Sequence, residues 1–165
     1  MNNFHKIHKV VVPSARAARL WEEAVRVSNE NHTFSDVIVC VGANYTQSLT
    51  PVIAIKETQE LLIAISELFP NARIAWSLTL PQFDRPRLPV FGAVLTGIRY
   101  ANDVMADFCV GNGFSIIFTP EFSLFEHDFA SVRNLFAHDG VHLNKSGIEA
   151  MSAAIREYIF DIYMY

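Results

Sequence analysis

The sequence contains only two cysteines and no long run of apolar residues. Cys40 falls in a predicted buried strand and Cys109 in a predicted helix, so both are expected to be free thiols of a reducing compartment. No apolar stretch approaches the ~20 residues that a membrane-spanning helix needs. The N-terminus has no signal-peptide core before a cleavage site. Together these absences predict a cytoplasmic protein without a membrane span.

Positive charge is also scarce. The chain has 13 Lys and Arg against 17 Asp and Glu, a formal net charge of -4. Nucleic-acid binding needs clustered Lys and Arg, so nucleic acid is not expected as a partner. By contrast, 51% of the 165 residues are hydrophobic, which predicts a single domain with a large core.

Strands and helices are predicted to alternate along the chain. Apolar runs rich in β-branched residues predict strands at 7–12, 37–41, 73–80 and 114–119. Helical spacing predicts helices at 15–27, 50–69, 90–109 and from 144 onwards, with one or two helical turns within 122–137. This order predicts a three-layer α/β/α fold in which helices cover both faces of a mostly parallel sheet.

Several finer expectations follow from the same patterns. Trp21 belongs to the apolar face of the first helix, and apolar residues at alternate positions of 73–80 predict a strand. The last helix is expected to bury a stripe of residues at helical spacing: Ile148, Met151, Ile155, Ile159 and Ile162.

The polar residues of interest follow strand ends. In parallel α/β folds, ligands bind beyond the carboxyl ends of the strands. Ser14, the segment from Gly42 to Asn44, the loop 81–89 and the loop from Asp139 to His142 all fall at or beyond such ends. The topology therefore predicts a site on this side of the sheet.

Asp139 and His142 are the strongest candidates for chemistry. They are three residues apart, a separation at which a carboxylate on a tight turn reaches an imidazole and fixes its tautomer. Asn144 is expected to cap the helix that follows. The pattern favours a histidine that transfers a proton and an aspartate that orients it.

The motif Asp139-Gly-Val-His142-Leu-Asn144, with Gly147 after it, resembles the last sequence block of the SGNH (GDSL-type) esterase and lipase superfamily. The strand that ends at Gly42-Ala-Asn44 is similar to that family's Gly-x-Asn-Asp block. The resemblance spans roughly residues 10 to 160. It implies a flavodoxin-like fold and hydrolysis of small esters, with Gly42 and Asn44 in the oxyanion hole and no cofactor.

The chain departs from the family pattern in two places. Tyr45 stands where the family has Asp, and the first block, Gly-Asp-Ser with the nucleophilic serine, is not recognisable. We therefore expect a chain that is truncated at its N-terminus or degenerate. An inactive esterase-like binding module, for example a mobile-element-derived fragment, is the alternative to an esterase. An exposed sheet edge left by the missing strand would favour self-association.

The nucleophile stays open at this level. Ser14 either replaces the family's oxyanion-hole glycine or, if the N-terminal strand slides into the gap, occupies the position of the nucleophile. Ser48 and Ser77 are weaker candidates because one lies in a polar loop and the other within a strand.

The remaining histidines suggest no metal site. His138-Asp139-x-x-His142 has the spacing of a helical zinc motif, but a helix that begins at Asn144 cannot contain it. Surface or loop positions without partners are expected for His5, His8, His32 and His127.

Overall fold

The fold was analysed in a computed structural model, which describes residues 8, 16–30, 32–41, 51–83, 91–123 and 127–163. Three strands and six helices lie within these ranges, in the order α1 (Ala17–Ser28), β1 (Asp36–Cys40), α2 (Pro51–Leu68), β2 (Arg73–Ser77), α3 (Phe91–Gly111), β3 (Ser115–Ile117), α4 (Pro120–Ser123), α5 (Phe129–Arg133) and α6 (Lys145–Tyr163). The predicted strand 7–12 lies outside the described residues. The other predicted elements are present. Strands β2 and β3 are shorter than predicted, whereas β1 has the predicted five residues, shifted by one position.

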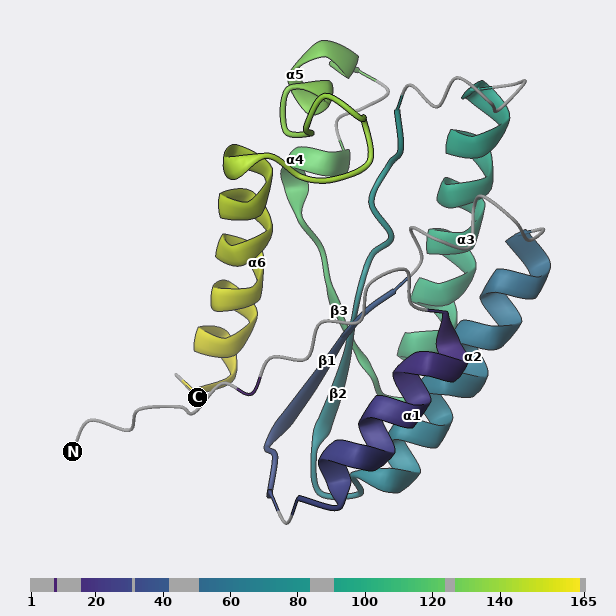
Figure 1. Ribbon diagram of the computed structural model, residues 1–165, viewed down its shortest axis with the longest axis vertical. Coiled ribbons are helices and arrows are strands. Elements are labelled where there is room, and N and C mark those ends of the chain that lie inside the picture. The colour runs from purple at the N-terminus through teal and green to yellow at the C-terminus, as the bar shows by residue number, and fades with distance from the viewer. Residues whose placement is uncertain are drawn as a thin grey trace.

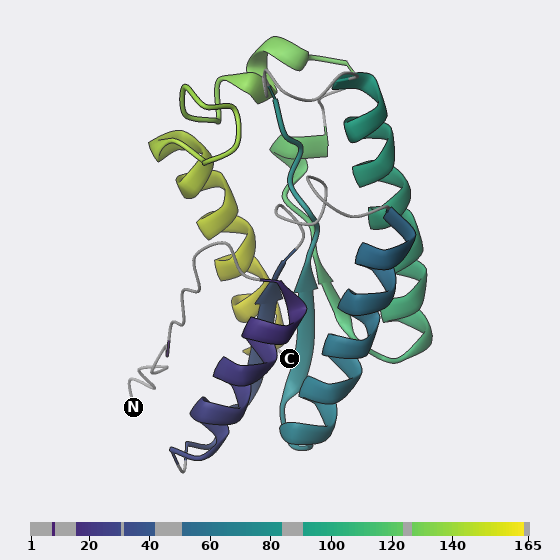
Figure 2. The same cartoon turned by 45° about the vertical axis from the view of Figure 1, so that its right-hand side comes forward.

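The strands form a parallel sheet in the order β1-β2-β3. Val39 pairs with Trp76, and Trp76 in turn pairs with Ile116. Parallel strands need crossover connections, and helices α2 and α3 supply them. Figures 1 and 2 show α1, α2 and α3 on one face of the sheet and α6 on the other. The predicted three-layer α/β/α architecture is confirmed.

Each face of the sheet contributes to a separate core. Ile74 and Trp76 of β2 pack on the side of α1, α2 and α3 together with Leu62. Ala75, between them in sequence, packs against Ala154 of α6 on the opposite side. Four of the five residues of β2 are buried, because helices cover both sides of the sheet.

Two burial predictions fail at the edges of the helical layers. Trp21 of α1 is 36% exposed, whereas Ala17 and Val27 of the same helix are buried. Cys40, predicted to be buried, is exposed at the last position of β1, while Cys109 is fully buried in α3 as expected. Among the described strands β1 is an edge strand, with a neighbour on only one side.

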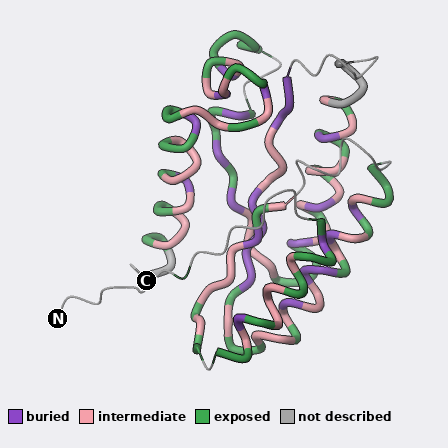
Figure 3. The backbone as a smooth tube through the Cα atoms, in the orientation of Figure 1, coloured by how far each residue is buried: buried purple, intermediate pink, exposed green. Residues whose placement is uncertain are grey.

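The predicted buried stripe of α6 is confirmed for Met151 and Ile155, which pack against buried residues, but not for Ile148 at its start. Ile148 is 55% exposed, whereas Ala154 is buried. Gly147 faces inward instead. Its backbone lies so close to Leu135 that a Cβ at this position would be 2.1 Å from the Leu135 carbonyl oxygen. The next residue, Ile148, points about 100° around the helix and so meets solvent. Figure 3 shows the resulting exposed outer side of α6.

In the described ranges, no helix combines the length and apolar character that crossing a membrane requires.

Candidate active site

The loop that joins α5 to α6 carries the candidate catalytic pair. It lies beyond the end of β3, together with α4 and α5, at the carboxyl edge of the sheet (Figure 1). A small aromatic core supports it: Phe83, Phe122, Val132 and Phe136 are all buried there. The rings of Phe83 and Phe136 meet edge to face at a centroid distance of 5.0 Å. The loop is thus seated on packed side chains at the edge where the sequence predicts a site.

Asp139 binds His142 as the sequence predicts. Asp139 Oδ2 lies 2.5 Å from His142 Nδ1. The other carboxylate oxygen accepts hydrogen bonds from the backbone N–H groups of Val141, at 2.9 Å, and His142, at 3.0 Å. This arrangement leaves Nε2 of His142 without a hydrogen-bond partner among the described residues. The geometry fixes the tautomer with Nδ1 protonated and presents Nε2 as a proton acceptor.

The pKa of Asp139 is held well below its usual range. The largest cause is the hydrogen bond with the His142 side chain, followed by the backbone hydrogen bonds from Val141 and His142. The carboxylate is therefore ionised at neutral pH, the form that stabilises a protonated imidazole. Because the His142 side chain is 82% exposed, solvent screens this interaction.

Gly140 clamps the loop to the segment that follows β2. Phe83 donates its backbone N–H to the Gly140 carbonyl at 2.7 Å. Gly140 has φ +68°, and a Cβ at this position would lie 2.2 Å from the Phe83 carbonyl oxygen. Only glycine fits both the left-handed conformation and the close approach. The clamp holds the residue that follows Asp139 against a buried phenylalanine.

Arg133 is a site component that the sequence analysis missed. Its guanidinium donates to the carbonyl oxygen of Ala137 at 2.9 Å and to that of His138 at 3.0 Å. It thereby binds the two backbone carbonyls that immediately precede Asp139. A basic residue in the last turn of a predicted short helix is a signal for such carbonyl binding, although here the carbonyls belong to the loop.

Asn144 has the predicted capping role and a second one. Its Oδ1 accepts from the Gly147 N–H at 3.1 Å, which caps α6 as expected. Its Nδ2 also donates to the carbonyls of Asn134 and Phe136, at 2.6 and 3.1 Å. One amide therefore joins both ends of the loop that contains Asp139 and His142.

The end of β1 is connected to the same edge. The last backbone hydrogen bond between the two strand segments runs from the Leu78 N–H to the Ile117 carbonyl. One residue further on, the Thr79 N–H donates to Asn102 Oδ1 and Asn102 Nδ2 donates to the Thr79 carbonyl, both at 2.9 Å; Asn102 belongs to α3. Thr79 Oγ1 also donates to the Val41 carbonyl at 3.2 Å. Val41 directly precedes Gly42 in the sequence. The segment 78–83 thus contacts both the end of β1, through Thr79, and the catalytic loop, through Phe83.

The structure describes only part of the predicted site. Ser14, Gly42, Asn44, Tyr45 and Ser48 lie outside the described residues. Ser77 ends β2 and is 3% exposed, so it is poorly placed to attack a substrate.

The two metal expectations have different outcomes. His138 and His142 lie on a turn before α6, so the helical zinc motif is absent, as expected. The expectation that the other histidines have no partners is wrong for His32, which lies 3.6 Å from a Glu30 oxygen with His8 nearby.

The fold matches those of known lipases and acylhydrolases. A GDSL-like lipase from Bacteroides thetaiotaomicron superposes with a TM-score of 0.71 at 13% identity, covering 90% of this chain and 73% of that one. A lipase/acylhydrolase from Enterococcus faecalis gives a TM-score of 0.68 at 16% identity, covering 88% and 71%. A peptidoglycan O-acetylesterase superposes with a TM-score of 0.61 at 12% identity; the match covers 90% of this chain and 44% of that one. No protein-family model and no curated protein sequence matches the chain. The chain therefore has an SGNH/GDSL-type fold.

Proposed function

With the SGNH/GDSL-type fold as the premise, we propose that the protein hydrolyses esters of small acyl groups through an acyl-enzyme. In this mechanism His142 takes the proton of a serine hydroxyl as the oxygen attacks the ester carbonyl, and later returns it to the leaving alcohol. Asp139 orients the imidazole and stabilises its protonated form. Ser14 is the proposed nucleophile, and Asn44 and Gly42 donate hydrogen bonds to the oxyanion.

The Asp139–His142 contact is the observation that carries the proposal. A hydrogen bond of 2.5 Å to Nδ1 leaves Nε2 available on an exposed ring. The loop is held by backbone and side-chain hydrogen bonds from Phe83, Arg133 and Asn144. A surface aspartate and histidine paired by chance would not need such support. A fixed base is what general base catalysis requires.

The competing function is an inactive esterase-like binding module. Tyr45 in place of the family's Asp and the missing Gly-Asp-Ser block favour it. In serine hydrolases, loss of one triad member leaves only ~10³–10⁴-fold acceleration over water. The two functions therefore differ by whether a serine reacts at all.

A fluorophosphonate probe tests the proposal because it labels only an activated serine. The wild-type protein is expected to gain one adduct by mass spectrometry and to hydrolyse a short-chain aryl ester. Ser14→Ala abolishes both, and His142→Ala slows labelling by roughly 10³-fold or more. Ser28→Ala and His127→Ala are the matched controls and should behave as wild type.

Each outcome separates the two functions. Labelling that persists in Ser14→Ala but is lost in Ser48→Ala contradicts the assignment of Ser14 as the nucleophile. No adduct and no turnover in the wild type would reject the esterase and favour the binding module. Labelling that is unaffected by His142→Ala would refute the catalytic role of the Asp139–His142 pair.

A further inference from the structure

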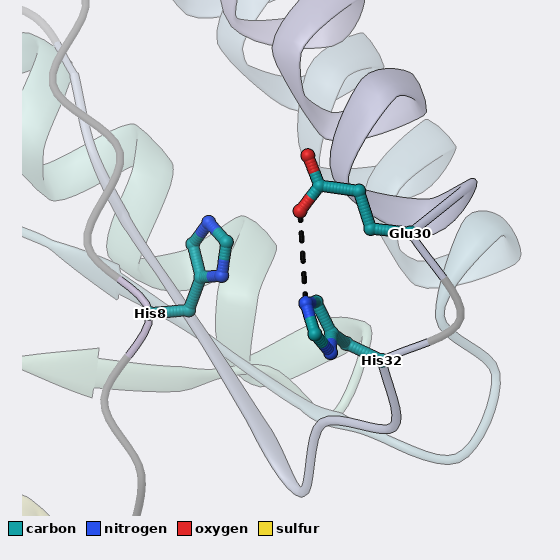
Figure 4. A group of neighbouring side chains, drawn as sticks. All are labelled: His8, Glu30 and His32. Atoms are coloured by element: carbon teal, nitrogen blue, oxygen red, sulfur yellow. Dashed lines mark ion pairs between the residues drawn. The ribbon is translucent and has the colours of Figure 1, made fainter.

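A second group of potential ligands lies at the other end of the sheet. His32 precedes β1 and Glu30 follows α1, so both lie at the amino edge of the strands. His8 approaches them from the segment before α1 (Figure 4). The three side chains each offer one ligand atom, and these atoms all lie within 4.8 Å of one another. The catalytic loop lies at the opposite, carboxyl edge (Figure 1).

The donor set matches that of a borderline transition metal. Two imidazoles and a carboxylate are common protein ligands of Zn²⁺. With bonds of about 2.0–2.2 Å in tetrahedral geometry, neighbouring donor atoms lie roughly 3.4 Å apart. His32 Nε2 and Glu30 Oε2 already lie 3.6 Å apart. The ring centroid of His8 lies 5.6 Å from that of His32 and its ligand atom lies within 4.8 Å of the other two, so His8 must move closer for all three to share one ion.

Neighbouring side chains hold two of the ligands in place. The other carboxylate oxygen of Glu30 is paired with Arg26, which orients the carboxylate and leaves Oε2 toward His32. Phe34 meets the rings of His8 and His32 edge on, at centroid distances of 6.1 and 6.0 Å, and itself packs against Phe69. Support of this kind for ligating side chains is typical of metal sites.

We propose that His8, Glu30 and His32 bind a Zn²⁺ ion, with a fourth position open to water. The ion joins the segment before α1, through His8, to the residues after α1, through Glu30 and His32. Because the ion lies at the opposite edge of the sheet from the catalytic loop, it has no part in the proposed ester hydrolysis. The proposal is independent of the proposed esterase activity.

Isothermal titration of the metal-free full chain with Zn²⁺ tests the site. One ion per chain is expected to bind, and the melting temperature should rise with Zn²⁺ because the ion binds only the folded arrangement. His8→Ala, His32→Ala and Glu30→Gln should each weaken binding at least 10–100-fold, the loss seen when even indirect supports of a metal site are removed. The three side chains are exposed, so these variants are expected to fold.

The controls are other exposed histidines of the same chain. His127→Ala should retain wild-type affinity. His142→Ala should retain it too, which separates the proposed site from the Asp139–His142 pair. Co²⁺ in place of Zn²⁺ should show the visible absorption of a low-symmetry site containing nitrogen ligands, and His8→Ala should remove it. Undetectable Zn²⁺ binding by the wild type overturns the proposal, as does binding that survives His8→Ala or His32→Ala or is lost in His142→Ala.

Discussion

Replacing Gly140 with alanine tests how firmly the catalytic loop is clamped. Two penalties are expected. An L-residue at φ +68° costs about 1–2 kcal/mol. A Cβ at 2.2 Å from the Phe83 carbonyl oxygen cannot be accommodated by a side-chain rotation, since the contact is with backbone. The loop must then move away, which breaks the 2.7 Å hydrogen bond between Phe83 and Gly140, worth about 1 kcal/mol, and disturbs packing at a cost of about 1–3 kcal/mol.

Gly113→Ala provides a matched control. Gly113 has nearly the same backbone angle, φ +71°, but a Cβ at this position, just after α3, would meet no atom within 4 Å. Gly113→Ala should therefore lose only the backbone term of about 1–2 kcal/mol. Gly140→Ala should lose about 3–6 kcal/mol, a large part of the stability of a typical domain.

Urea unfolding followed by tryptophan fluorescence measures the difference, because Trp76 is 1% exposed and will report on unfolding of the core. Equal destabilisation by Gly140→Ala and Gly113→Ala would refute the clamp. If the esterase proposal holds, Gly140→Ala should also reduce turnover of the short-chain aryl ester, whereas Gly113→Ala should not.

Four further predictions follow from the site and the core. Asp139→Asn should cost most at neutral pH. Because the pKa of Asp139 is lowered well below its usual range in the folded state, its stabilising contribution is fully present above about pH 4 and declines below it, so the gap between the urea midpoints of variant and wild type should begin to narrow only as the pH falls below about 4. Arg133→Ala should slow any ester hydrolysis without changing its pH profile, and Arg133→Lys should restore part of the rate; wild-type activity in Arg133→Ala would refute a positioning role. Burial raises the pKa of both thiols, that of Cys109 to about 11, but only Cys109 is fully buried, so Cys109 should resist thiol reagents in the native protein and the surface-exposed Cys40 should react first, as peptide mapping after alkylation would show. Self-association predicted from an exposed sheet edge should appear in sedimentation as a mass that rises with concentration; one constant monomer mass would contradict it.

The sequence predicted the layers of this fold and the Asp139–His142 contact well, for physical reasons. The spacing of apolar residues reflects which side of a helix or strand is buried. In α2 and in the strands this spacing recurs over many positions, so the element type can be predicted from it. The contact between Asp139 and His142 is local, with the two residues three positions apart, so a turn alone can bring them together. Asn144 as the cap of α6 is local in the same way.

The failures concern contacts between distant segments. Nothing in the sequence around Phe83 indicates that its backbone binds Gly140, and the three-residue cluster of His8, Glu30 and His32 joins two segments separated by a helix. The exposure of Ile148 depends on how α6 is rotated, which Gly147 decides through its approach to Leu135. Periodicity gives the stripe of a helix but not its rotation to within one residue.

The Asn102 side chain has a consequence for how this fold can vary. At Thr79 the extended segment after β2 has no pairing partner in β3. The Asn102 carboxamide accepts from the Thr79 N–H and donates to the Thr79 carbonyl, which are the two hydrogen bonds that a neighbouring strand would make. Aspartate at position 102 could accept but not donate, and leucine could do neither. Homologous chains that keep an extended segment here should therefore retain a carboxamide at this point of α3, or else lengthen the third strand by a residue to replace it.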